Sequence, residues 1–199
     1  MITVLKLKEP EWDFHEICRY SRCVPGDEAT DALIRECMEE AAPLLTYSVC
    51  FDTVPVTRKM ENVTCIADFP VMSAKLERSL NGCSEAVLFA ATVGLGIDRL
   101  IMKYGYISPA KASVFQGIGA ERIESLCNEF CGIRNSELNR EGKQLLPRVS
   151  PGYGDIPLEL QRFLLPYLDS RRKIGLTINS GMIMSPSKSV TAIAGICEL

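Results

Sequence analysis

The residues from Arg148 to Pro157 combine side chains that could form a binding site for a small charged molecule. The planar guanidinium of Arg148 can donate two parallel hydrogen bonds to a ligand carboxylate. Gly152 lets a ligand approach the backbone without a Cβ, while Pro151 and Pro157 stiffen the chain so that its N–H and C=O groups can be aimed in advance. Tyr153 adds a ring face and a hydroxyl. The same residues also form ordinary Pro/Gly connections between elements, and residue chemistry alone favours that second interpretation.

Two glycine pairs resemble parts of nucleotide-binding loops but lack the rest of the pattern. Gly94-x-Gly96 follows an apolar run, yet Arg99 stands where a dinucleotide-binding fold needs a third glycine. Gly117-x-Gly119 fails in the same way and lies within a helical pattern. No Walker lysine follows a glycine-rich loop. We therefore interpret these residues as tight-turn glycines and do not expect a nucleotide phosphate site.

Nine cysteines and one histidine limit the metal and thiol chemistry that the chain can perform. A single histidine, His15, cannot build a multi-histidine metal site, and its apolar neighbours favour an ordinary packing or surface role. The cysteines show no C-x-x-C spacing and most have apolar neighbours, so we expect reduced thiols in the core and no metal site. Cys127 and Cys131 share a helical face, which leaves a thiol-based redox protein as an alternative from another functional class.

The composition is typical of a water-soluble globular chain. Of 199 residues 47% are hydrophobic, and this length fits one domain over residues 1–199. The formal net charge of −3 leaves no basic excess, so we expect no nucleic-acid partner. The longest apolar stretches, such as Ala86 to Ala91, are too short to span a bilayer, and the first residues lack the features of a signal peptide. We expect a cytoplasmic protein that has no membrane partner.

The spacing of apolar residues predicts the elements that must position the Arg148 segment. Helices are expected over residues 11–22, 27–42, 73–80, 97–104, 108–131 and 158–168. Strands are expected over residues 1–6, two or three times within 45–70, and over 85–93, 173–179 and 189–197. Three prolines should keep residues 145–157 extended and non-helical. This order indicates an α+β fold, with helices packed on a mixed or antiparallel sheet.

The segment that begins at Arg148 resembles the C-terminal activation (reactivation) domain of cobalamin-dependent methionine synthase. The residues that carry the resemblance are Arg148-x-x-x-Gly152-Tyr153, Pro157, Thr177-x-x-Ser180-x-Met182, Met184-x-Pro186-x-x-Ser189-Val190 and Gly195. Leu88–Gly94 and Gly119–Glu124 are similar to segments of short, free-standing members of this family. The resemblance covers the chain from about Tyr20 onward, and it implies the fold of that domain.

This resemblance implies a binding site for S-adenosylmethionine along an extended R-x-x-x-G-Y segment. Arg148 would contact the methionyl carboxylate, and the backbone around Ser150, Pro151 and Gly152 would contact the adenosyl part. Tyr153, which the resemblance places in the catalytic position, would lie next to the ligand. It would face the corrin when a cobalamin module docks.

An acidic residue on the preceding helix completes the implied site, and the pattern places it at Glu124. A shift of one residue would put Ser125 there instead. A carboxylate near the sulfonium and amino groups makes electrostatic sense. The chain departs from the family where Gly154–Pro157 replaces proline-alanine-cysteine-proline, and the ligand-binding aspartate and tyrosine segments of full-length domains have no clear counterpart. A thinner site, weaker affinity, and completion by a partner or a second subunit all stay open.

The resemblance also implies a function in trans. Short members are expected to serve methionine synthases that lack this domain. Those methionine synthases would carry the cobalamin. An electron from flavodoxin or a similar donor and a methyl group from S-adenosylmethionine would return inactive cob(II)alamin to methylcobalamin. The protein would contribute position, not a side-chain nucleophile. The alternative is an S-adenosylmethionine-binding or docking module for another corrinoid methyltransferase, without catalysis of its own.

Overall fold

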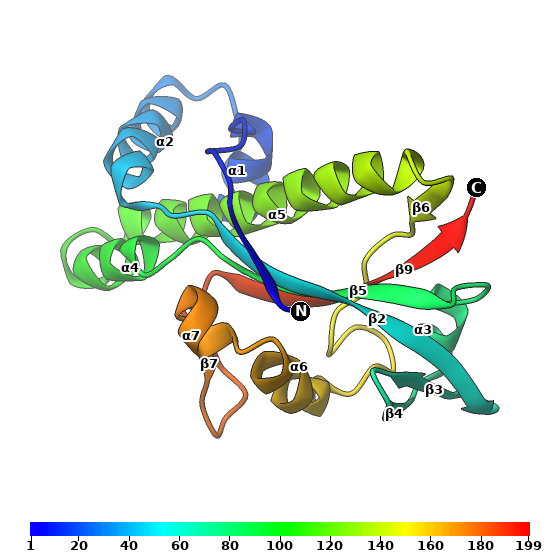
Figure 1. The fold of residues 1–199 in the computed structure, drawn as a ribbon. Coiled ribbons are helices and arrows are strands. Elements are labelled where there is room, and N and C mark those ends of the chain that lie inside the picture. Colours follow the sequence, from blue (N-terminus) through cyan, green and yellow to red (C-terminus); the bar gives the residue numbers. More distant parts are fainter.

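The computed structural model describes residues 1–199 and shows an α+β fold built on one large antiparallel sheet (Figure 1). The strands are β1 (Thr3–Lys6), β2 (Ser48–Met60), β3 (Val63–Ile66), β4 (Phe69–Met72), β5 (Glu85–Thr92), β6 (Lys143–Leu145), β7 (Thr177–Ile178), β8 (Met184–Ser185) and β9 (Ser189–Glu198). Seven of them form the sheet in the order β4-β3-β2-β5-β9-β6, with β1 paired to the first residues of β2. The two remaining strands, β7 and β8, form a separate hairpin. All of these pairings are antiparallel, which confirms the predicted fold class.

Helices cover both faces of this sheet. They are α1 (Phe14–Ser21), α2 (Glu28–Ala41), α3 (Ala74–Ser79), α4 (Gly96–Ile107), α5 (Pro109–Asn139), α6 (Gln161–Tyr167) and α7 (Ser170–Ile174), with short 3-10 turns at Ala42–Leu44 and Leu158–Leu160. Figure 1 shows the long helix α5 above the sheet with α1, α2 and α4, while α6 and α7 lie below it. Two hydrophobic cores result, one on each face.

Strand β5 separates the two cores, which explains its nearly continuous apolar sequence. Its side chains alternate between the faces, so Phe89 packs toward α5 while Leu88 packs toward α6. The Phe89 ring lies 4.8 Å from that of Phe130 on α5, measured between ring centroids. Because β5 is buried on both faces, it fixes the position of α5 relative to β9, its neighbour in the sheet.

Three of the predicted helices begin where the sequence places their first residue, and in each a side chain there caps the helix. The side chains of Asp27, Ser73 and Ser108 each accept a hydrogen bond from a backbone N–H of the first turn. Two predictions need correction. Helix α5 does not end near residue 131 but continues to Asn139, because Leu138 still packs into the core. The strand expected over residues 173–179 is wrong for its first half, where α7 ends at Ile174 and is followed by Gly175, a residue with a positive φ of 70°.

The glycine pair after β5 allows a close backbone approach, as expected for structural glycines. A Cβ on Gly96 would lie 2.1 Å from the backbone oxygen of Leu44, and a Cβ on Gly94 would lie 2.4 Å from Oγ1 of Thr46. Gly94 also has a positive φ of 81°. These contacts account for both glycines without a bound phosphate.

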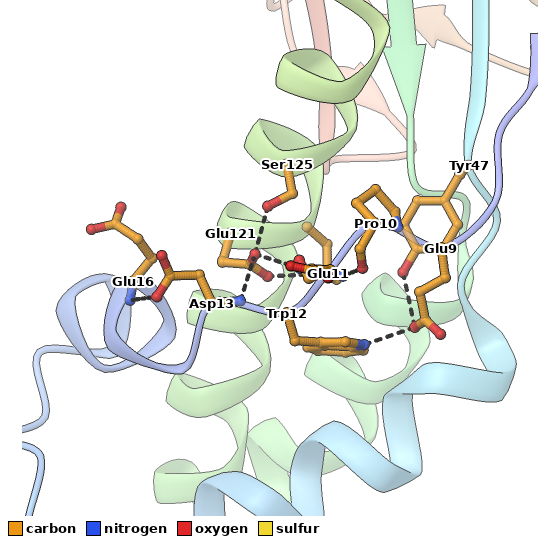
Figure 2. Close-up of polar contacts among 10 residues, drawn as sticks. Glu9, Pro10, Glu11, Trp12, Asp13, Glu16, Tyr47, Glu121 and Ser125 are labelled. Carbon is orange, nitrogen blue, oxygen red and sulfur yellow. Dashed lines mark hydrogen bonds and ion pairs between the residues drawn. The ribbon is translucent and has the colours of Figure 1, made fainter. Parts of the chain in front are cut away.

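A buried ion pair fastens the N-terminal segment to α5. Arg122 and Glu121 pair at 2.5 Å, and their side chains are 0% and 2% exposed. The Arg122 guanidinium donates to the backbone oxygens of Pro10 and Glu11 at 2.7 and 2.6 Å. As Figure 2 shows, Glu121 accepts hydrogen bonds from Ser125 and from the backbone N–H of Asp13. These contacts hold the middle of α5, the helix that also carries Glu124.

Candidate functional site

An open cavity of about 1000 Å³ lies between α3, α5 and the segment Leu146–Tyr153. Four of the predicted site residues line it, namely Glu124, Arg148, Ser150 and Tyr153. Helix α3 adds Lys75, Arg78 and Ser79. The structure therefore brings most of the predicted site together around one cavity.

Arg148 is held between two side chains of α5. Its Nη2 atom donates to Oε2 of Glu124 at 2.6 Å, and its Nη1 atom donates to Oδ1 of Asn128 at 2.7 Å. Glu124 and Asn128 are four residues apart on a helix and so lie on the same face. Burial alone would lower the pKa of Arg148, but the nearby Cys127 and Glu124 outweigh it and raise that pKa. The guanidinium therefore stays charged at the cavity wall.

The backbone of the segment is extended only over its first part. Val149 pairs with Ile193 of β9 through N–O distances of 2.9 and 2.8 Å, and the N–H of Leu146 donates to the oxygen of Gly195. From Ser150 the chain turns instead of running on, because the N–H of Tyr153 donates back to the Ser150 oxygen at 3.1 Å. The expectation of a wholly extended R-x-x-x-G-Y segment is corrected accordingly.

This turn changes the roles that the backbone can play. Gly152 has a positive φ of 85°, which favours glycine, and its N–H donates to the oxygen of Ile156 at 2.9 Å. Pro151 is part of the turn and is buried, and neither Pro151 nor Gly152 lines the cavity. Ser150 is the predicted backbone contact that does reach the cavity.

Asp155, one of the residues that departs from the family pattern, ties the turn to α3. Its carboxylate accepts hydrogen bonds from Oγ of Ser73 at 2.6 Å and from the N–H groups of Ala74 and Lys75 at 2.8 and 3.0 Å. The Ser73 hydroxyl and these N–H groups lower the pKa of Asp155. The carboxylate thus places α3 beside the cavity, where Nζ of Lys75 lies 5.4 Å from the centre of the Tyr153 ring.

The charge of the cavity is mainly positive. Lys75, Arg78 and Arg148 contribute three cations, and Glu124 contributes the one carboxylate of the lining. The two α3 cations were not predicted, because nothing in the local sequence shows that α3 faces Arg148. Asn128 was also missed, although its position four residues after Glu124 placed it on the same helical face.

The thiols do not form a second candidate site. All nine cysteines are free, and burial raises the pKa of Cys127 to about 12. The pKa of Cys131 is raised as well, mainly by burial. Since a redox cysteine acts as a thiolate, these shifts give the redox alternative no support. His15 is exposed on α1.

No group of three or more His, Cys, Asp and Glu side chains is arranged to hold a metal ion. None of the helices is both long and apolar enough to cross a membrane.

One of three comparisons with known proteins finds a match, and that match supports the fold. No family model and no curated protein matches the sequence. Among solved structures, the crystal structure of the MetH reactivation domain bound to AdoHcy matches with a TM-score of 0.67 and 16% sequence identity. The match covers 98% of this chain and 78% of that one. At this low identity the likeness extends to the fold alone, so the resemblance drawn from the sequence is confirmed at that level: the chain has the fold of the MetH reactivation domain.

Proposed function

We propose that this protein binds S-adenosylmethionine in the cavity beside Arg148. The observation that carries the proposal is the Arg148 guanidinium, which stands charged at the cavity wall between Glu124 and Asn128. A solved structure of the same fold was determined with AdoHcy bound, which supports a ligand of this type.

The chemical groups around the cavity fit the ligand. The ligand carboxylate would pair with Arg148. The Arg148 guanidinium has more N–H donors than the two that it gives to Glu124 and Asn128, so further donors remain for the ligand. The ligand's ammonium and sulfonium groups would be stabilised by Glu124, the single carboxylate of the lining. A volume of about 1000 Å³ lies at the upper end of the usual range for ligand sites.

The wider role that we propose is that of a free-standing reactivation factor, with residues 1–199 as one domain in the cytoplasm. S-adenosylmethionine would supply an electrophilic methyl group on its sulfonium. This chain would hold that ligand for methyl transfer to cobalamin carried by a methionine synthase core, with an electron from flavodoxin or a similar donor. Positioning of the reacting atoms would be its contribution to a methyltransferase activity that the two proteins share.

Tyr153 is placed where it could contact both the ligand and a cobalamin-carrying partner that docks on this chain. Its side chain is part of the cavity lining, yet the residue is 60% exposed. A large aromatic ring at the mouth of a site can contact both a bound ligand and an arriving partner. We therefore assign to Tyr153 the position that faces the partner's corrin.

Binding is tested directly by calorimetry with S-adenosylmethionine. We expect saturable binding that Arg148→Ala weakens by about tenfold or more, because a charged hydrogen-bonding partner is lost. Arg140→Ala, at the exposed end of α5, removes the same charge away from the cavity lining and should bind like the unmodified protein. Equal affinities for the two variants, or no binding by the unmodified protein, would contradict the proposal.

Reconstitution separates the reactivation factor from the alternative binding module. A methionine synthase core with cob(II)alamin, a reductant and S-adenosylmethionine would be assayed with and without this protein. We expect methylcobalamin to form only when the protein is present. S-adenosylmethionine binding without this gain would favour a docking module for another corrinoid methyltransferase.

A further inference from the structure

Asn128 contacts Arg148, although it is not among the site residues predicted from the sequence. It is an exposed residue of α5, and its Oδ1 atom accepts a hydrogen bond from Nη1 of Arg148 at 2.7 Å. Glu124 holds Nη2 of the same guanidinium at 2.6 Å. Two acceptors on one helical face thus fix the direction of the Arg148 side chain, which is 21% exposed.

The two acceptors differ in charge, and this difference decides how much positive charge the cavity keeps. Glu124 neutralises one side of the guanidinium, while the amide of Asn128 orients the other side without neutralising it. With Lys75 and Arg78 nearby, the lining carries three cations against one carboxylate. A second carboxylate at position 128 would pair with Arg148 in place of a ligand anion.

We infer that Asn128 is a positioning residue that makes the site selective for ligands with a free carboxylate. This inference rests on the proposed function, because it concerns the same cavity. Asn128 aims Nη1 of Arg148 and leaves the guanidinium charge available. The amide itself need not touch the ligand.

The test compares two ligands and two variants by calorimetry. The ligands are S-adenosylmethionine and its decarboxylated analogue, which keeps the sulfonium, the amine and the adenosyl part. Asn128→Asp adds a carboxylate next to Arg148. Ser136→Asp adds the same charge eight residues later on an exposed part of α5, about 12 Å along the helix axis and beyond a Debye length.

We expect Asn128→Asp to weaken S-adenosylmethionine binding by about tenfold or more, because the new carboxylate would pair with the Arg148 guanidinium in place of the ligand carboxylate. Binding of the decarboxylated analogue should not weaken, and Ser136→Asp should leave both affinities unchanged. Asn128→Ala should weaken S-adenosylmethionine binding less than Asn128→Asp, because it removes the orienting acceptor without adding a charge.

Several results would overturn the inference. Equal losses for both ligands in Asn128→Asp would show a merely structural effect, and equal losses in Asn128→Asp and Ser136→Asp would show a general charge effect. Unchanged S-adenosylmethionine binding in Asn128→Asp would show that Asn128 does not position Arg148 for the ligand carboxylate. Absence of S-adenosylmethionine binding by the unmodified protein would instead refute the proposed function, and this inference with it.

Discussion

Removal of Arg122 is expected to destabilise the fold strongly, because it would strand the buried carboxylate of Glu121. The pair is almost completely shielded from water, with the side chains 0% and 2% exposed. Breaking a buried ion pair by removing one partner costs about 3–5 kcal/mol, since the remaining charge has no counterion. Arg122→Met also leaves the backbone oxygens of Pro10 and Glu11 without their donor.

For a chain of this length, each kcal/mol corresponds to about 2–4 °C in Tm, so Arg122→Met should lower Tm by about 6–20 °C. Urea unfolding followed by circular dichroism would give the change in free energy of unfolding, and calorimetry would give Tm. The double variant Glu121→Gln/Arg122→Met should recover a large part of the loss. Its amide removes the stranded charge and still offers an oxygen to Ser125 and to the N–H of Asp13.

The matched control is Lys103→Met, which removes a cation from the exposed pair between Lys103 and Glu40. Exposed pairs contribute little, so this variant should unfold almost like the unmodified protein. The reasoning would be refuted if Arg122→Met cost less than about 1 kcal/mol. It would also be refuted if the double variant were as unstable as the sum of two independent losses.

Two further predictions concern a glycine and a carboxylate. Gly96→Ala should lower Tm clearly, because its Cβ would lie 2.1 Å from the Leu44 backbone oxygen. Gly105→Ala in the same helix is the control, since its Cβ meets nothing within 4 Å and alanine favours the helix, so Tm should rise slightly. Equal Tm values for the two variants would contradict this account. The pKa of Asp155 is lowered below its ordinary value of 3.8 in the folded state, so its contribution to stability is complete above that value and is lost as the pH falls through the folded-state pKa. Asp155→Asn should therefore make Tm less dependent on pH between about pH 5 and pH 2, and an unchanged pH profile would show that the contacts with α3 do not matter.

Local features of the sequence were enough to predict most elements. Asp27, Ser73 and Ser108 begin helices because their side chains satisfy backbone N–H groups within three residues, a purely local interaction. The apolar run over residues 85–93 predicted a strand, and the structure confirms it as β5, which is buried on both faces. Residues 173–179 misled the same reasoning, because a short alternating pattern cannot show that Gly175 ends a helix there.

The site depended on contacts between residues far apart in the chain. Arg148 meets Glu124 across 24 residues, and Asp155 meets Ser73 across 82. The motif around Arg148 marked one wall of the cavity, since its residue types are suited to a carboxylate. The charges of Lys75 and Arg78 reach that cavity only because the carboxylate of Asp155 caps α3 and the sheet sets α5 opposite it. The chemistry of a side chain follows from its residue type and can be recognised in the sequence. The electrostatic field of a cavity is the sum of contributions from residues that come close together only in the folded chain.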